Sequence, residues 1–243
     1  MKKFVHCIAI AILSVSMTSV FAQETEAPAN EGNSCETKLD VGLDIYSSYI
    51  WRGLKFGYGP AFQPKVELTS GGFTLGAWGN VNANSGHDAG ENPEAFEADL
   101  YTSYTFPFGL TLGLNDYYFG GNYLGVSFNN MARTHSIEPF FEYVYDDNLT
   151  FYGALMFMEE RVTDFYCQVS YDFDLFNFAI GAGDGQYTMN PVYKNGGEFS
   201  FCNLTISKEK TIKVTDSFKI PVTGAVTLNP TNERFFVYVG MSF

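Results

Sequence analysis

The chain has 243 residues, a formal net charge of −13 at pH 7 and an aromatic content of 17%. This acidic balance argues against nucleic acid as a partner, because phosphate binding needs clustered Lys and Arg. The length suits one barrel or sandwich domain.

Residues 1–22 predict a cleaved secretory signal peptide. Lys2 and Lys3 form a basic head, residues 7–15 form a short apolar core, and residues 20–22 (VFA) make an acceptable cleavage site. We therefore expect export from the cytoplasm.

Residues 23–37 (QETEAPANEGNSCET) are polar and acidic, and they predict a flexible periplasmic lead-in because they cannot bury enough apolar surface to fold alone. Residues 38–243 are expected to form a single domain. The cysteines after the leader, Cys35, Cys167 and Cys202, have no recognisable metal or disulfide spacing, and a bridge between Cys167 and Cys202 is left open.

From residue 38 onward the dominant pattern has a period of two. In the first segment Leu39, Val41 and Leu43 share one face, while Asp40 and Asp44 share the other. The pattern recurs about twelve times between turn residues. The expected strands are 38–53, 61–70, 73–82, 95–106, 110–119, 135–145, 149–159, 164–173, 175–183, 198–207, 217–228 and 234–243.

Such two-faced strands suit either a soluble sandwich or a membrane barrel, and the connections favour the barrel. The turns after the second, fourth, sixth and eighth strands are short, whereas the loops after the third, fifth and ninth are long. This asymmetry is typical of outer-membrane barrels. The sequence therefore predicts an all-β fold, an antiparallel transmembrane β-barrel of about 12 strands. The long periplasmic connection 208–216 and the short extracellular connection 229–233 fit less well.

Four segments resemble those of known outer-membrane proteins. The last strand, with Val239, Met241 and the terminal Phe243, resembles the signal read by the barrel-assembly machinery. YSSYIWRGL resembles the S-x-Y-x-W-R-G stretch of the Gcw_chp, or TorF-like porin, family, and NGGEFSF and PVTGAVTLNP resemble segments of related barrel proteins of Bacteroidetes. The resemblance implies a barrel in the outer membrane of a Gram-negative bacterium, with lipid and the assembly machinery as its partners.

Aromatic side chains with outward parity predict interfacial belts, where Trp and Tyr meet lipid headgroups. Trp51 is expected at the end of the first strand, in the outer leaflet. The other belt candidates are Tyr49, Tyr104, Tyr143 and Tyr171.

The opposite parity predicts a lumen lined mainly by acids. Its charged candidates are Asp40, Asp44, Arg52, Lys65, Glu67, Glu97, Asp99, Glu138 and Glu142. Tyrosines of the same parity are Tyr46, Tyr101, Tyr152, Tyr166 and Tyr238. Either the lumen is a water-filled path that favours cations, or Arg52 and Lys65 pair with Glu67, Glu97 and their neighbours and plug the barrel. A count of twelve strands does not decide between these.

We predict no catalytic residue, no metal and no cofactor. His135 has outward parity, as in barrel enzymes that act on lipids, but no outward serine is expected near it. GAGDG at 181–185 lacks the helix that a dinucleotide loop needs. HDAGENPE at 87–94 lacks EF-hand spacing and is better interpreted as a solvated acidic loop than as a calcium site.

The sequence favours a passive porin for small solutes with a cation-preferring lumen. The first alternative is a closed barrel that is structural or binds partners through loop residues Tyr123, Phe128, Tyr187 and Tyr193. The second is a lipid-modifying enzyme.

Overall fold

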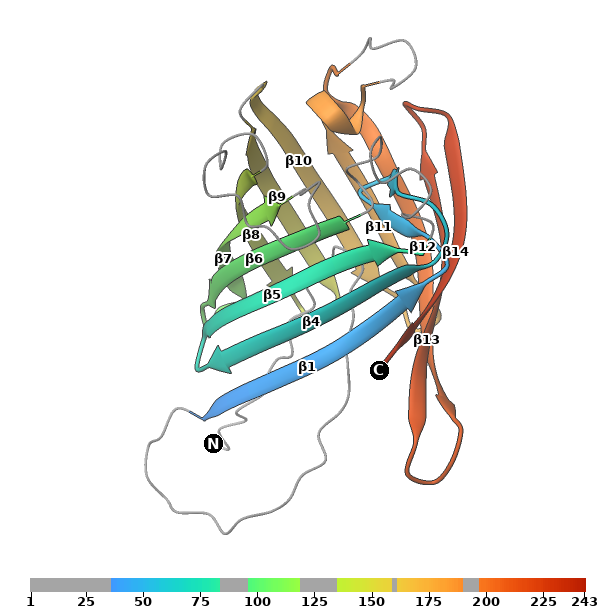
Figure 1. Cartoon of the computed structure of the whole chain (residues 1–243). Helices are drawn as coiled ribbons and strands as arrows, with labels where there is room; N and C mark the ends of the chain where they lie inside the picture. The colour runs from blue at the N-terminus through green and yellow to red at the C-terminus, as the bar shows by residue number, and fades with distance from the viewer. Residues whose placement is uncertain (1–35, 84–95, 119–134, 159–160, 190–196) are drawn as a thin grey trace.

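The computed structural model describes residues 36–83, 96–118, 135–158, 161–189 and 197–243. Twelve antiparallel strands form a closed barrel, with β1 next to both β4 and β14 (Figure 1). The predicted fold class is therefore confirmed. Within the described ranges, no helix is long and apolar enough to cross a membrane.

The wall follows chain order from β4 to β14. Its strands are β1 (Thr37–Tyr46), β4 (Ala61–Ser70), β5 (Phe73–Asn82), β6 (Phe96–Thr105), β7 (Leu110–Tyr118), β8 (His135–Tyr145), β9 (Leu149–Met158), β10 (Arg161–Asp172), β11 (Asn177–Gly183), β12 (Ser200–Lys213), β13 (Lys219–Asn229) and β14 (Arg234–Ser242). Three short elements lie outside this order: β2 (Tyr49–Trp51), β3 (Leu54–Phe56) and the 3-10 helix η3 (Gly185–Tyr187).

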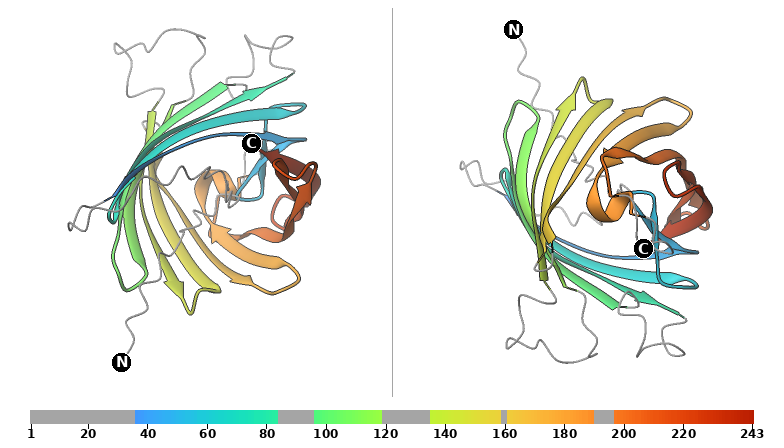
Figure 2. Two further views of the ribbon diagram at one scale, coloured as in Figure 1. Left: turned by 90° about the horizontal axis from the view of Figure 1, so that it is seen from below. Right: turned by 90° about the horizontal axis from the view of Figure 1, so that it is seen from above.

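The strands are apolar on the outside of the barrel and polar on the inside. Along β13, Val226 and Leu228 are exposed, whereas Thr227 and Asn229 are buried. This distribution reverses that of a soluble protein, and it suits a barrel whose outer surface contacts lipid. The axial views in Figure 2 show the strands as a closed wall.

One end of the barrel has the short turns, which in outer-membrane barrels face the periplasm. β1 starts and β14 finishes toward this end. The connection predicted at 208–216 is largely strand instead. β12 continues to Lys213 and pairs with β13 as far as Lys213↔Lys219.

A short seam closes the barrel between β1 and β14. Only Asp44↔Ser242, Ile45↔Met241 and Tyr46↔Gly240 pair across it. Backbone hydrogen bonds of 2.9 Å in both directions between Leu43 and Phe243 extend the seam to the last residue of the chain. The terminal residue thus closes the barrel.

Gly240 lies in this seam directly against the ring of Tyr46. A Cβ on Gly240 would lie 2.2 Å from Cε1 of the Tyr46 ring, so Gly240→Ala must displace that ring. We expect the free energy of unfolding in lipid vesicles to fall by about 1–3 kcal/mol, the usual cost of overpacking. Gly224→Ala is the control, because nothing lies within 4 Å of its Cβ. Equal stability of the two variants in urea titrations would contradict the prediction.

Candidate functional site

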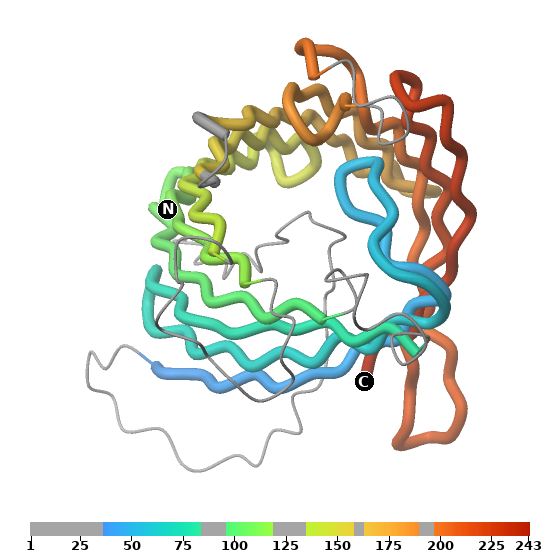
Figure 3. The backbone as a smooth tube through the Cα atoms, turned by 45° about the horizontal axis from the view of Figure 1, so that its top comes forward, coloured from blue at the N-terminus to red at the C-terminus, as the bar shows by residue number. Residues whose placement is uncertain are grey.

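Between β1 and β4 the chain leaves the wall and folds into the barrel as a hairpin, drawn in blue inside the ring of Figure 3. Its pairs are Tyr49↔Phe56, Ile50↔Lys55 and Trp51↔Leu54. Arg52 and Gly53 form the two-residue turn, with φ of 50° and 79°. Two positive φ values are typical of a type I′ turn, in which glycine is favoured.

The turn packs tightly against the wall. A Cβ on Gly53 would lie 1.9 Å from the carbonyl oxygen of Cys202 on β12, so only glycine fits. The side-chain amide of Asn229 donates to Gly53 O at 3.2 Å and to Tyr187 O at 3.4 Å. Asn229 is fully buried and therefore holds the turn beside η3.

Arg52 crosses the lumen to Glu138 on β8. Its Nη1 donates to Glu138 Oε2 at 2.6 Å, and its Nη2 donates to Glu138 Oε1 at 2.9 Å. The exposed fractions of the two side chains are 5% and 0%. This is a buried, bidentate ion pair, the geometry in which an Arg–carboxylate contact is strongest.

Tyrosines surround the ion pair. Arg52 also donates to the hydroxyls of Tyr187 and Tyr152, at 2.7 and 2.8 Å. Glu138 accepts further hydrogen bonds from Tyr117 at 2.9 Å and Tyr152 at 3.0 Å. Both charges are therefore satisfied without water, as buried charges require.

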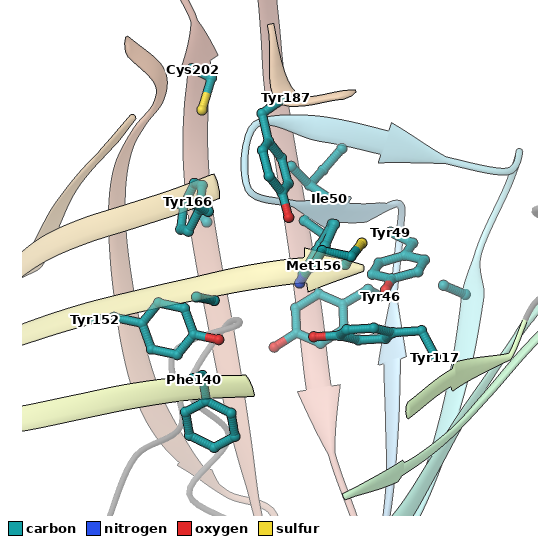
Figure 4. Close-up of a cluster of buried hydrophobic side chains, with 14 of the residues drawn as sticks. Tyr46, Tyr49, Ile50, Tyr117, Phe140, Tyr152, Met156, Tyr166, Tyr187 and Cys202 are labelled. Atoms are coloured by element: carbon teal, nitrogen blue, oxygen red, sulfur yellow. The ribbon is translucent and has the colours of Figure 1, made fainter. Parts of the chain in front are cut away.

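Aromatic rings fill the space around the hairpin. The Arg52 guanidinium lies 4.3 Å from the centre of the Trp51 ring and 4.5 Å from that of Tyr166, within cation–π range. Trp51 also contacts the rings of Tyr117 and Tyr187, each at 5.8 Å. Figure 4 shows Tyr117, Tyr152, Tyr166 and Tyr187 converging on this cluster. The lumen thus contains an aromatic core at the level of the hairpin.

The hairpin also meets the acidic wall of β6. The Tyr49 hydroxyl is hydrogen-bonded to Glu97, and its ring lies 5.6 Å from that of Trp78. Asp99, the next inward residue below Glu97, is buried, and its Oδ1 has no hydrogen-bond donor within the described part of the chain. Two carboxylates therefore lie side by side at the edge of the hairpin.

The predicted lumen residues lie on the inner side of the barrel. Asp44, Glu97, Asp99, Glu138 and Glu142 are all buried there. Their partners differ from those expected. Arg52 pairs with Glu138, Lys65 lies 3.3 Å from Asp40, and Glu67 accepts from the Tyr101 hydroxyl at 3.0 Å.

The belt prediction for Tyr49 and Trp51 is wrong. Both side chains are buried inside the barrel, with exposed fractions of 9% and 7%. The alternation of β1 does not continue through residues 47–48, where the chain leaves the wall, so outward parity is lost there. The expected strand 38–53 is therefore β1 followed by half of the inward hairpin.

The other belt and assembly candidates lie on or near the outer surface. Tyr104 and Tyr171 are exposed near the short-turn end, where they contact the rings of Phe106 and Phe173. Tyr143 is partly buried at the same end. Val239 and Met241 are exposed on β14, and Phe243 follows them in the closing seam.

Sequence reasoning missed several residues of the site, including Tyr117 and Asn229. Tyr187 was expected on an exposed loop, but its exposed fraction is 0%. The other loop candidates, Tyr123, Phe128 and Tyr193, lie outside the described residues. The available signal was the Arg-Gly pair between the alternating apolar residues YIW and LKF, which is a hairpin pattern.

The enzyme hypothesis depends on His135, and the structure shows an acidic partner for this residue. His135 Nδ1 lies 2.8 Å from Asp116 Oδ1 at the outward face. The register places Leu100 and Ile137 beside Asp116 and Tyr118 opposite His135, so no serine lies directly opposite either residue of the pair in these strands.

Among the described residues, no group of three or more His, Cys, Asp or Glu could hold a metal ion. Cys167 and Cys202 are free thiols, so the bridge left open between them is not formed. GAGDG ends β11 and leads into the three-residue η3. HDAGENPE lies outside the described residues.

No family model and no curated protein match the chain. Among solved structures it is similar to a KdgM porin, with a TM-score of 0.45 and 10% identity over 84% of this chain and 97% of that chain. It is also similar to a triple mutant of the Rh. blastica porin, with a TM-score of 0.41 and 13% identity over 75% of this chain and 55% of that chain. The resemblance to the Gcw_chp family stays a prediction.

Proposed function

We propose that the protein is an outer-membrane channel for small solutes, in which the β2–β3 hairpin forms the constriction. The observation that carries this proposal is the position of the hairpin. It lies inside a barrel lined by polar side chains, and the buried Arg52–Glu138 pair fixes it to the opposite wall. An inward-folded segment of this kind limits the size of the solutes that pass.

The charges of the lumen support a preference for cations. Arg52 is neutralised by Glu138, and Lys65 lies beside Asp40. The inner face also carries the carboxylates of Asp44, Glu67, Glu97, Asp99, Glu142 and Asp164. Rings of carboxylate favour cations in channels.

A salt gradient across a planar bilayer tests this proposal. We expect a steady current with a cation-selective reversal potential. Glu97→Gln combined with Asp99→Asn should move that potential toward zero, whereas Glu233→Gln, on an exposed loop, should leave it unchanged. An unchanged potential in the double variant would remove these two carboxylates from the selective path.

The second candidate is a closed barrel that acts through its loops. It is favoured by the very low exposure of Asp44, Glu138 and Glu142 on the inner face, at 2%, 0% and 1%. A barrel of this kind passes no steady current when it is reconstituted. Such a result would contradict the channel and support the alternative.

The proposal also covers the cellular location of the protein and its family. We propose that residues 1–22 direct export and that the assembly machinery recognises the β14 strand with its terminal Phe243. We also propose membership of the Gcw_chp family of Bacteroidetes, on the resemblance of YSSYIWRGL to its motif alone. This stretch includes Arg52 and Gly53, the two residues of the inward turn.

A further inference from the structure

The β12–β13 hairpin extends past the periplasmic end of the barrel wall. Lys208 Nζ donates to the carbonyl of Asp174 at 2.8 Å, which places Lys208 level with the turn between β10 and β11. β11 pairs with β12 only as far as Asn177↔Ser207, whereas β12 and β13 stay paired to Lys213↔Lys219. Figure 1 shows this hairpin projecting beyond the lower end of the barrel.

One face of the projecting hairpin continues the lipid-facing surface of the barrel. Directly opposed residues of neighbouring strands lie on the same face, and Ile206↔Val226 is an exposed, outward pair. The alternate pairs below it share its face: Lys208↔Gly224, Lys210↔Val222 and Ile212↔Ile220. The opposite face carries Glu209↔Thr223, Thr211↔Pro221 and Lys213↔Lys219.

The outer face combines apolar side chains with positive charge. Ile212, Val214 and Phe218 are exposed by 49%, 54% and 37%. Val214 donates its backbone N–H to Phe218 O at 3.0 Å, which continues the ladder toward the tip. Exposed apolar residues next to lysines are typical of surfaces that lie at a membrane interface.

The charge of this hairpin is opposite to that of the rest of the chain. Residues 208–219 hold four lysines and two acids, although the chain as a whole carries 27 acids and 14 bases. Lysines near a membrane surface attract anionic lipids, each by about fivefold in affinity.

We propose that the outer face of the β12–β13 hairpin binds an anionic phospholipid of the periplasmic leaflet. Lys208 and Lys210 contact the phosphate, and Ile212, Val214 and Phe218 enter the interfacial region. Continuity with the lipid-facing surface favours a lipid over a soluble acidic protein, because the exposed Ile212, Val214 and Phe218 extend the apolar outer surface toward the tip of the hairpin. The proposal is independent of whether the lumen conducts.

Quenching of a tryptophan at the tip by brominated lipids tests the proposal. The probe is Phe218→Trp in vesicles that contain phosphatidylcholine and phosphatidylglycerol, with bromine on one of the two lipids at equal mole fraction. The native Trp51 and Trp78 give little background, because Trp51 is buried in the core inside the barrel and Trp78 packs against that core. We expect stronger quenching by brominated phosphatidylglycerol than by brominated phosphatidylcholine.

Matched variants test whether the preference for phosphatidylglycerol depends on the lysines of the outer face. Lys208→Gln with Lys210→Gln should lower the preference for phosphatidylglycerol about twenty-five-fold, and replacing both lysines by Arg should keep it. Lys213→Gln with Lys219→Gln, on the opposite face, should also keep it. Heat-modifiable gel mobility verifies that each variant forms the barrel.

Three results would overturn the proposal. Equal quenching by the two headgroups would mean that no anionic site exists. Absence of quenching by either lipid would place the hairpin in water, where a soluble partner is the better occupant. Equal losses in the two glutamine variants would show that net charge matters and the face does not.

Discussion

Arg52→Ala is expected to destabilise the protein by about 3–5 kcal/mol, because it leaves the Glu138 carboxylate buried without its counter-charge. The remaining donors to Glu138 are neutral, and they come from Asn115, Tyr117 and Tyr152. Urea titration in lipid vesicles measures the free energy of unfolding. Trp51 fluorescence measures the release of the hairpin, because its ring contacts those of Tyr117 and Tyr187 while the hairpin stays in place.

Lys55→Ala is the matched control, since it removes a positive charge from the same hairpin. Lys55 is exposed, and its Nζ lies 5.7 Å from the centre of the Tyr58 ring. We expect a change within about 0.5 kcal/mol, as is usual at exposed positions. A loss as large as that of Arg52→Ala would show that charge alone holds the hairpin.

A double-mutant cycle isolates the ion pair from the loss of packing. Glu138→Ala alone should also be costly, because it leaves Arg52 buried without a carboxylate. The double variant should be more stable than the sum of the single losses predicts, with a coupling energy of about 0.5–3 kcal/mol. If the losses of the two single variants simply add in the double variant, the Arg52–Glu138 interaction itself contributes nothing to the free energy of unfolding.

Removal of the whole hairpin should have the largest effect on transport. Tyr46 and Ala61 are directly paired across β1 and β4, so a two-residue Asn-Gly turn can replace residues 47–60 without changing the register. The wall strands then keep their pairing, while Trp51, Arg52 and their partners no longer meet. We expect a barrel of the same strand order with a wider lumen.

The fold was predictable because its main signal is local. A period of two with one apolar face identifies each wall strand, and the alternation of short and long connections identifies the membrane environment. The same period of two gave a wrong prediction where it continues into residues that are not part of the barrel wall. Residues 49–56 alternate like a wall strand, although they belong to a hairpin inside the lumen.

At the lower end of β12 the prediction erred in the other direction, because it missed residues that belong to a strand. KEKTIK at 208–213 has little apolar content, so it predicted a connection, yet it is paired strand. Its partner strand supplies the apolar residues that the segment itself lacks. Local hydrophobicity therefore underestimates strands that extend beyond the barrel wall.

The site was less predictable than the wall because its contacts are not local. Arg52 and Glu138 are 86 residues apart in the sequence. Strand parity shows only which carboxylates face inward, so it does not identify the one that pairs with Arg52. Tyr187 lies in a polar stretch that is typical of an exposed loop. Its burial depends on the hairpin, which fills the space beside η3.

The single-channel conductance of the chain with and without residues 47–60 tests the central claim most directly. If the β2–β3 hairpin limits permeation, the shortened barrel passes a several-fold larger unitary current, while Lys55→Ala gives the wild-type value. If both barrels pass the same current, the hairpin does not form the constriction and the proposed channel mechanism is wrong.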